Sequence, residues 1–439
     1  MIRAFLFVTL LTSNAFAQAS QPALPQVRYN DFAATQSPIT QSLAQYWRAF
    51  AAAHPKKHGV FAKLGDSLSA NLAYLTCFGP RHRPQLGANA ELARTLRFFS
   101  TPLASGDTSF DRASTATKVS EDAPWLLTHN GHELAALEPQ FATVTIGTND
   151  LNFGGAASAI GPQFWRTTQA QLFFLVDNSL AAGVIPMLST IPLRRDRANE
   201  VSTYNAIVRS VAQARQIPFI DVARGLSLLP NAGVGPDGVH LTQYPGGACD
   251  LSSRGLQYGY NARNRLTLTA LDRWSRALFA KDATFDPEPA PLAGKGSIAS
   301  PLIIDRLPFS DARALSATAY KDIGQYSCAQ PQPGSEFVYE LNLAKPTPVR
   351  ILVLGKSSQI TCRSKGFECE GASDVTANLL QGRPSGDACV ASGNTVVQKG
   401  LTAGKYYITV DTSWVGGDPM VDDYMIVVTK CDDGDPRCL

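Results

Sequence analysis

The chain has 439 residues, of which 39 are Lys or Arg and 36 are Asp or Glu, for a formal net charge of +3. No basic cluster is interleaved with aromatic residues, so this nearly balanced charge argues against nucleic acid as a partner. A chain of this length exceeds what one hydrophobic core usually organises, and we therefore expect two domains.

The N-terminal stretch MIRAFLFVTLLTSNAFAQAS has the layout of a secretory signal peptide. Arg3 precedes an apolar run from Ala4 to Leu11, and an A-x-A cleavage site follows at Ala15 to Ala17. The run is too short to span a bilayer, and no later segment approaches the roughly 20 apolar residues that a spanning helix needs. We expect residues 1–17 to be removed and the protein, without a transmembrane segment, to be secreted or periplasmic.

The next part of the chain has the pattern of an α/β domain. Apolar residues recur at helical spacing in three segments, residues 38–54, 163–183 and 199–216. Short apolar runs predict strands at residues 60–64, 96–100, 141–147, 184–191 and 217–222. Strands that alternate with helices of this length imply a mainly parallel sheet with helices on both faces. Ligands of such sheets bind beyond the carboxyl ends of the strands, so the loops there are candidate sites.

A change of composition and period divides the chain near residue 300. The segment 286–301, DPEPAPLAGKGSIASP, is rich in Pro, Gly, Ala and Ser and predicts a linker between domains at 18–285 and 302–439. Beyond the linker, alternating or apolar runs predict the strands of a small antiparallel β-sandwich at residues 336–343, 349–355, 374–382, 405–412 and 422–430.

The eight cysteines follow the same division, because six of them lie beyond residue 327. An even number of cysteines on an exported chain favours disulfides over metal binding. We expect Cys77 to pair with Cys249. Six cysteines allow fifteen connectivities, and local pairs Cys362/Cys369 and Cys431/Cys438 are the simplest guess for the tail.

Three fragments carry candidate chemistry: KLGDSLS at 63–69, TIGTNDLNF at 145–153 and GPDGVHLT at 235–242. A serine hydroxyl becomes a strong nucleophile when a base removes its proton, and the base works best when a carboxylate holds its tautomer. We therefore interpret Ser67 as the nucleophile, His240 as the base and Asp237 as the carboxylate. The Asn149 side chain and the Ser67 backbone N–H are candidate donors to the oxyanion that forms during attack on a carbonyl.

These fragments resemble blocks of the GDSL, or SGNH, hydrolase family. Gly65-Asp66-Ser67-Leu68 resembles the first block, Gly147-x-Asn149-Asp150 the third and Asp237-x-x-His240 the fifth. The resemblance, over about residues 59–275, implies a three-layer α/β/α fold of the flavodoxin-like SGNH type. It also implies a Ser67, His240, Asp237 triad, an acyl-enzyme intermediate, and Asn149 as an oxyanion donor.

The second block of that family supplies a further oxyanion donor, a glycine N–H that follows the second strand. The region SGDTSFDRASTATKVSED contains one glycine, Gly106, and we assign this role to it. A side-chain-bearing residue near Ser114 or Ser120 is the alternative, because its backbone N–H would donate equally well.

The C-terminal part resembles bacterial pre-peptidase C-terminal domains, which are non-catalytic β-sandwiches appended to exported hydrolases. The resemblance lies in the segments 326–328, 336–339 and 401–412.

Two further motifs carry weaker signals. His129 and His132 form H-N-G-H without a third ligand nearby, so we interpret them as part of a solvated loop rather than a metal site. The stretch GLQYGYNARNRL, at 255–266, either braces the loop that carries His240 or contacts substrate.

The sequence thus predicts an exported serine esterase that cleaves carboxylic esters, with an acylated polysaccharide or a lipid as the candidate substrate. Serine chemistry requires no metal or organic cofactor. Two other classes stay open. One is a carbohydrate- or surface-binding adhesion protein with a vestigial hydrolase domain, and the other is a structural envelope protein with incidental esterase activity.

Overall fold

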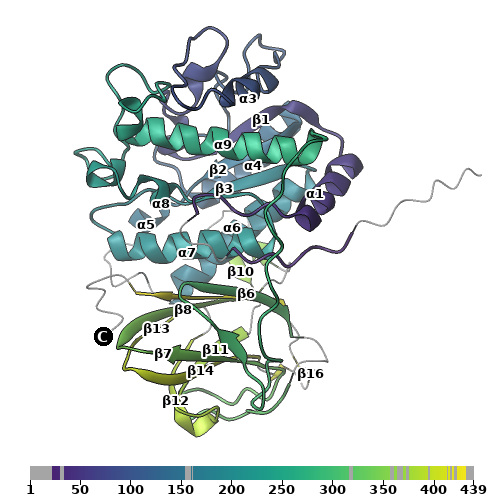
Figure 1. The fold of residues 1–439 in the computed structure, drawn as a ribbon, viewed down its shortest axis with the longest axis vertical. Coiled ribbons are helices and arrows are strands. Elements are labelled where there is room, and N and C mark those ends of the chain that lie inside the picture. Colours follow the sequence, from purple (N-terminus) through teal and green to yellow (C-terminus); the bar gives the residue numbers. More distant parts are fainter. Residues whose placement is uncertain are drawn as a thin grey trace, which may run out of the picture.

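The computed structural model describes residues 22–29, 34–153, 160, 162–315, 320–355, 360–362, 369–371, 375–393, 396–412, 414–415, 418–419 and 423–431. The predicted signal peptide lies outside these residues. Helices and a parallel sheet form the upper part of Figure 1, and a β-rich part lies below them. No helix among the described residues is both long and apolar enough to cross a membrane.

The first part is built on a four-stranded parallel sheet with the order β1-β2-β3-β4. Its strands are β1 Lys57–Gly65, β2 Pro139–Thr145, β3 Ile185–Ser189 and β4 Phe219–Ile220. All residues of β2 and β3 are buried, as expected for strands covered on both faces. Four of the five predicted strands are therefore confirmed.

Helices cover both faces of this sheet, and the architecture is the expected three-layer α/β/α one. One group consists of α1 Gln41–Ala53 and α3 Leu92–Phe98, which each contact α9 Gly259–Phe279. The other consists of α4 Ala123–Leu137, α6 Pro162–Ala181 and α7 Ala198–Ala214. Figure 1 shows α9 and α7 on opposite sides of the strands. Shorter helices are α2 Ser67–Ala70, α5 Asp150–Phe153 and α8 Val222–Leu226, with 3-10 turns at Thr76–Phe78, Pro230–Gly233 and Gly255–Gln257.

The strand predicted at residues 96–100 is wrong, because this segment belongs to α3 and its C-terminal end. Leu92, Thr95 and Phe99 are buried at spacings of three and four, which is the helical period. Phe99 then packs edge-on against Phe61 of β1, with ring centroids 5.4 Å apart. The apolar run that predicted a strand therefore ends a helix whose Phe99 packs against the sheet.

The predicted solvated loop around His129 and His132 is also wrong. Both residues lie on α4, which begins after the cap Asp122, whose side chain accepts the N–H of Trp125 at 3.0 Å. The His129 ring stacks on Trp125 at a centroid distance of 4.2 Å, and its Nδ1 lies 2.8 Å from the Trp125 carbonyl oxygen. His129 thus belongs to the helix surface.

The second part consists of two sheets that enclose a core of their own, which agrees with the predicted β-sandwich. Among the described residues, its strand pairs are antiparallel except β5 with β7, which is parallel. The five-stranded sheet has the order β12 Cys389–Gly393, β11 Val375–Gln381, β14 Gly404–Thr412, β7 Phe337–Leu343 and β5 Leu302–Ile304. The four-stranded sheet has the order β13 Val396–Leu401, β8 Thr347–Gly355, β17 Asp423–Lys430 and β6 Phe309–Ala314. Short pairs are β9 Ile360–Cys362 with β10 Cys369–Gly371 and β15 Trp414–Val415 with β16 Asp418–Pro419, and a 3-10 turn spans Gly386–Ala388.

The four-stranded sheet is buried on both faces. Alternate residues of β8 and β17, such as Ile351 and Ile426, point into the sandwich core. Leu352, Leu354, Met425 and Val427 belong instead to the hydrophobic cluster of the first part. Helix α7 contacts both β8 and β17, and Figure 1 shows the sandwich directly below this helix. The second part is therefore packed against the first rather than tethered at a distance.

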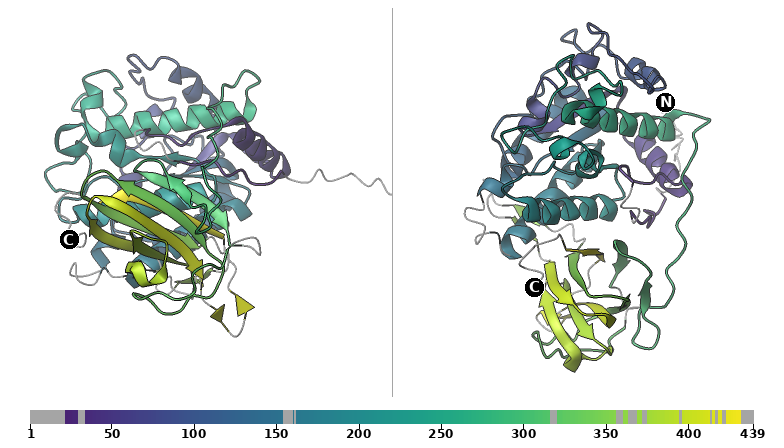
Figure 2. Two further views of the ribbon diagram at one scale, coloured as in Figure 1. Left: turned by 60° about the horizontal axis from the view of Figure 1, so that its bottom comes forward. Right: turned by 60° about the vertical axis from the view of Figure 1, so that its left-hand side comes forward.

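The predicted linker is anchored where it leaves the first part. The Asp286 N–H donates to the Ile39 carbonyl at 2.8 Å, and the Asp286 carboxylate accepts the Ile39 N–H at 2.6 Å. The Glu288 carboxylate accepts the N–H of Ser42 at 3.0 Å. The chain then runs along the edge of the molecule toward the sandwich, as the right-hand view of Figure 2 shows. The exact domain boundaries remain a prediction from composition.

Two disulfides are described, Cys77–Cys249 and Cys328–Cys389. The first is the predicted pair. Cys431 is disulfide-bonded, but its predicted partner Cys438 lies outside the described residues. Cys362 and Cys369 stand opposite each other in the register of β9 and β10.

Candidate active site

Ser67 lies at the point where β1 ends and the short helix α2 begins. Gly65, at the end of β1, has φ +143°, and a Cβ there would lie 2.0 Å from the Thr145 carbonyl oxygen of β2. Position 65 therefore needs glycine, because a side chain there would clash with the backbone of β2. Asp66 caps α2 by accepting the Leu68 N–H at 2.9 Å, and Ser67 itself is 8% exposed.

His240 and Asp237 approach Ser67 from the loop that follows α8 and its 3-10 turn. The Ser67 Oγ lies 3.0 Å from His240 Nε2, and His240 Nδ1 lies 2.7 Å from an Asp237 carboxylate oxygen. The other carboxylate oxygen accepts the N–H groups of Val239 and His240, each at 3.0 Å. The structure thus joins three sequence-predicted residues in one hydrogen-bonded series, although 173 positions separate Ser67 from His240.

The carboxylate of Asp237 is held in its ionised form. Partial burial tends to raise its pKa, but the Val239 N–H and the His240 side chain and N–H outweigh burial, so the pKa lies below its usual value. An ionised carboxylate keeps the proton of the facing imidazole on Nδ1, which leaves Nε2 free to accept one. Both side chains are exposed, 52% for Asp237 and 43% for His240, so the base opens directly to solvent.

Asn149 belongs to the loop that follows β2. Its side-chain NH2 donates to the Glu121 carbonyl at 2.8 Å. At Gly147, where φ is +124°, a Cβ would lie 2.1 Å from the ring of Tyr204, so this ring packs directly against the glycine. The Tyr204 hydroxyl donates to the Ile146 carbonyl at 2.9 Å and thereby fixes the end of β2.

Asp150, the last residue of the Gly147-x-Asn149-Asp150 motif, contacts the start of helix α4. It is buried, and its carboxylate accepts the N–H of Ala123 at 3.1 Å, at the start of α4. Burial, reinforced by the charges of Asp122 and Asp66, raises the pKa of Asp150 to about 7. The group therefore ties the Asn149 loop to α4.

Gly106, the predicted third oxyanion donor, uses its N–H in a hydrogen bond within its own turn. It is an exposed residue with φ +81°, and its N–H donates to the Leu103 carbonyl at 2.9 Å. A different part of the same region lies beside the nucleophile. The Gly65 N–H donates to the Ala116 carbonyl at 2.9 Å, and the Lys118 N–H donates to the Gly65 carbonyl at 3.2 Å. Thr117 pairs in parallel with Gly65, the last residue of β1, so the backbone after Lys118, which includes Ser120, begins beside the end of β1.

The sequence did not predict the residues that hold the Asn149 loop in place. Arg194 is 4% exposed, and its guanidinium donates to the Thr148 carbonyl at 2.5 Å. The neighbouring Arg195 N–H donates to the Gly238 carbonyl at 3.2 Å, so one loop contacts both the Asn149 loop and the His240 loop. This loop follows β3, and the rule that ligands bind beyond strand ends is the signal that could have identified it.

No group of three His, Cys, Asp or Glu side chains within the described ranges is placed to hold a metal ion. A cavity of about 870 Å³ lies between the segments 27–29 and 34–38 and the start of the linker, lined by Arg209, Arg273 and Asp286 among others. Its lining does not include Ser67, Asp237 or His240.

Comparison with known families agrees with this geometry. Residues 63–244 match the model of the GDSL-like Lipase/Acylhydrolase family. The match covers less than half of the chain, but it contains Ser67, Asn149, Asp237 and His240. It supports an ester-cleaving hydrolase. No curated protein matches the chain.

Solved structures of low identity are similar to about half of the chain. A GDSL-like lipase from Bacteroides thetaiotaomicron is 16% identical, with a TM-score of 0.34, over 53% of this chain and 98% of its own. An acetylxylan esterase from Geobacillus stearothermophilus is 16% identical, with a TM-score of 0.33, over 48% and 93%. An alpha/beta hydrolase enzyme from the metagenome of Lake Arreo, Spain, is 18% identical, with a TM-score of 0.33, over 48% and 94%. Similarity at this level carries no argument about substrate.

Proposed function

We propose that the protein is an exported serine esterase that cleaves carboxylic esters through an acyl-enzyme. The observation that carries this proposal is the series from Ser67 Oγ to His240 Nε2, at 3.0 Å, and from His240 Nδ1 to Asp237, at 2.7 Å. A serine, an imidazole and a carboxylate at hydrogen-bonding distances are what activation of a hydroxyl nucleophile requires.

In the proposed reaction, His240 takes the proton of Ser67 as its Oγ forms a bond to the ester carbonyl carbon. The electron pair of the carbonyl moves to its oxygen, and the tetrahedral intermediate collapses as His240 protonates the departing alcohol. Water then attacks the acyl-enzyme with His240 again accepting a proton, which releases the carboxylic acid and restores Ser67.

The oxyanion needs preorganised donors. The Ser67 N–H and the Asn149 side chain are two of them in this proposal. An amide NH2 group has two hydrogens, and the bond to the Glu121 carbonyl uses one of them, which leaves the other for the oxyanion. For the third donor we replace Gly106 by a backbone N–H in the segment 119–120, since that segment follows the bond between Lys118 and Gly65. Ser120 has φ +67°, a conformation that turns the chain there.

Two exposed apolar side chains favour an ester with an apolar group near the scissile bond. Leu72 is 78% exposed and lies just after Asn71, whose N–H donates to the Ser67 carbonyl at 3.1 Å. Val119 is 63% exposed and directly follows Lys118. An acyl chain or apolar alcohol would bury part of both, at roughly 25 cal/mol per Å² of apolar surface removed from water. The open exposure of the base also suits a bulky substrate such as an acylated polysaccharide or a lipid.

Export is supported by the signal-peptide pattern and by the Cys77–Cys249 and Cys328–Cys389 disulfides. Structural disulfides persist mainly in oxidising compartments. The rival hypothesis of a surface-binding protein with a vestigial site gains no support from these contacts, because a site released from catalysis need not retain the Ser67, His240 and Asp237 geometry.

The test is hydrolysis of p-nitrophenyl acetate and of esters with longer acyl chains by the processed protein, alongside Ser67→Ala and His240→Ala. We expect kcat to fall by at least about 10³-fold in both variants, as loss of a triad member does elsewhere. The matched control is His132→Ala, which removes an exposed imidazole on α4. Equal turnover in parent and both triad variants, or no turnover with any ester, would reject the esterase in favour of a binding protein.

A further inference from the structure

The first turns of α9 carry polar side chains that are completely buried. Asn261, Arg263 and Asn264 are each 0% exposed. They belong to the stretch 255–266, for which the sequence left bracing and substrate contact as alternatives. Their hydrogen bonds reach the loop that follows Ser67 and the loop that follows His240. Burying a polar group is costly unless it is hydrogen-bonded, so these contacts indicate a specific structural task.

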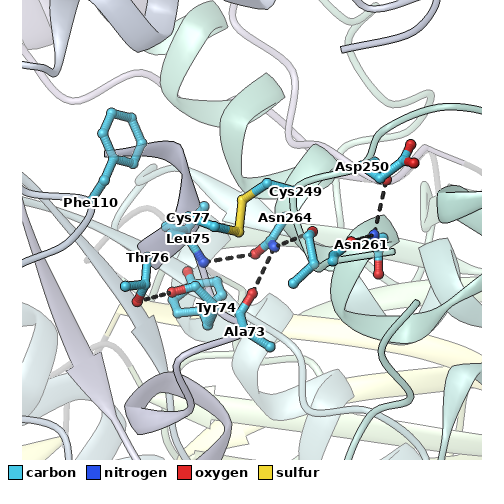
Figure 3. The surroundings of a disulfide bond; sticks show 12 residues. Ala73, Tyr74, Leu75, Thr76, Cys77, Phe110, Cys249, Asp250, Asn261 and Asn264 are labelled. Atoms are coloured by element: carbon cyan, nitrogen blue, oxygen red, sulfur yellow. Dashed lines mark hydrogen bonds between the residues drawn. A yellow bond between two sulfur atoms is a disulfide. The ribbon is translucent and has the colours of Figure 1, made fainter. Parts of the chain in front are cut away.

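Asn264 joins the two catalytic loops with one side chain. Its NH2 group donates to the Ala73 carbonyl at 2.8 Å and to the Ala248 carbonyl at 3.0 Å, and its carbonyl oxygen accepts the Leu75 N–H at 3.0 Å. Figure 3 shows these bonds meeting at Asn264. Ala73 and Leu75 lie a few residues after Ser67, and Ala248 lies eight after His240.

The Cys77–Cys249 disulfide joins the same two loops immediately beside Asn264 (Figure 3). It links positions 172 residues apart in sequence. Gln85 extends this junction, because its N–H donates to the Cys249 carbonyl at 3.1 Å and its carbonyl accepts the Leu251 N–H at 2.6 Å. The loop after Ser67 is thus connected to the loop after His240 by a covalent bond and by hydrogen bonds.

Asn261 binds the loop that follows His240, and Arg263 binds the backbone that follows Ser67. The Asn261 NH2 donates to the Gly247 and Asp250 carbonyls, each at 2.9 Å. The Arg263 guanidinium donates to the Leu68 carbonyl of α2 and, at 2.8 Å, to the Thr145 hydroxyl of β2. Helix α9 therefore serves as the common support for both loops.

We infer that Asn264 and the Cys77–Cys249 disulfide, together called the loop brace, position Ser67 and His240 for proton transfer. The inference rests on the proposed esterase function and assigns positioning, not catalytic, roles. The distance from Ser67 Oγ to His240 Nε2 spans two loops that lie far apart in sequence, so it depends on how firmly those loops are joined. A misplacement of about 1 Å at a reacting centre can cost on the order of 10²-fold in rate. The stretch 255–266 thus braces the His240 loop.

The first experiment removes the disulfide in a Cys77→Ser, Cys249→Ser double variant of the full chain. Its matched control is Cys328→Ser, Cys389→Ser, which removes the sandwich disulfide. Thermal unfolding followed by circular dichroism sets an assay temperature at which every variant is folded. There, kcat and KM for p-nitrophenyl acetate and the rate of Ser67 phosphonylation by an organophosphonate are measured. We expect kcat and the phosphonylation rate to fall at least tenfold in the first variant, with KM within twofold of the parent value, and both rates to stay within twofold in the control.

The second experiment uses Asn264→Asp, which keeps the acceptor for the Leu75 N–H and removes both donated bonds. Its control is Asn378→Asp in β11, where a side chain that is also 0% exposed donates to the Gln332 side-chain oxygen at 2.9 Å and the Thr409 hydroxyl at 3.1 Å. We expect both variants to lose thermal stability and only Asn264→Asp to lose kcat and phosphonylation rate.

The two ways in which the inference fails are distinguishable. Folded brace variants with the parent kcat and phosphonylation rate would overturn the positioning role while the esterase function stands. A parent protein that neither hydrolyses esters nor reacts with the phosphonate would overturn the proposed function and this inference with it.

Discussion

Replacing Asp237 by Asn tests the role of its carboxylate while keeping its shape. One carboxylate oxygen accepts the N–H groups of Val239 and His240, each at 3.0 Å, and an Asn side-chain oxygen can keep both bonds. The other oxygen, 2.7 Å from His240 Nδ1, becomes an NH2 group. That group donates rather than accepts, so it favours the imidazole tautomer with the proton on Nε2. Nε2 then faces the Ser67 Oγ, 3.0 Å away, and cannot take its proton.

The expected loss of kcat in Asp237→Asn depends on this tautomer and on the solvent exposure of the Asp237 side chain. In a serine protease with a buried carboxylate, the same change lowers kcat about 10⁴-fold. Here the Asp237 side chain is 52% exposed, and water screens part of the interaction between the carboxylate and the imidazolium. We therefore expect kcat to fall roughly 10³-fold, or about 4 kcal/mol at 1.4 kcal/mol per tenfold change.

The assay is steady-state hydrolysis of p-nitrophenyl acetate at pH 7 to 8, with folding checked by near-ultraviolet circular dichroism. Asp237→Ala is the companion variant, because it also removes the acceptor for the two backbone N–H groups. We expect it to lower kcat at least as far. An Asp237→Asn protein that retains more than a tenth of the parent kcat would refute the assignment of Asp237 as the residue that orients His240.

Three further predictions concern stability and loop geometry. Met425→Ala, at a 0% exposed position between the sandwich and the first part, should lower the free energy of unfolding in urea by about 2–5 kcal/mol; an unchanged urea midpoint would contradict the packed interface. Gly147→Ala, where φ is +124° and a Cβ would lie 2.1 Å from the Tyr204 ring, should cost at least about 1–3 kcal/mol and lower kcat; parent-like activity and melting temperature would show that the loop adapts. Burial raises the pKa of Asp411 to about 9 and that of Glu336 to about 7, so the folded state binds protons that the unfolded state releases above about pH 4. Stability from these groups is therefore lost as pH rises toward 9, and Asp411→Asn should flatten the fall in melting temperature between pH 5 and pH 9; an identical pH profile in parent and variant would reject this.

The elements that the sequence predicted correctly are those whose burial follows one simple period. Strands β2 and β3 are buried along their whole length, and such strands appear in the sequence as largely apolar runs, although β2 also buries Gln140, Thr143 and Thr145. The segment 96–100 was misassigned because a short apolar run does not distinguish a strand from a buried helix end. Helix α4 was missed because its sequence APWLLTHNGHELAAL contains a central Asn-Gly, which suggests a turn.

The candidate site also contains some groups that the sequence could predict and others that it could not. Ser67, Asn149, Asp237 and His240 could be named because each lies in a short motif whose residue types suggest a reaction. Ser67 and Asn149 follow strands β1 and β2, whereas Asp237 and His240 lie in the loop after α8 and its 3-10 turn. Gly106 was chosen as the one glycine in its region, but a backbone N–H donor needs no particular side chain and leaves no mark in the sequence. The Gly106 N–H donates to the Leu103 carbonyl within its own turn.

Residue types and local spacing by themselves predicted the proposed chemistry, from a serine and an imidazole three residues from a carboxylate, and they predicted two domains of different period. Only the tertiary structure decided what holds that chemistry in place. Asn264, Arg194 and the docking of β8 and β17 on α7 act through contacts between segments far apart in the chain. Such contacts depend on the three-dimensional path of the backbone, which no local pattern of residues specifies.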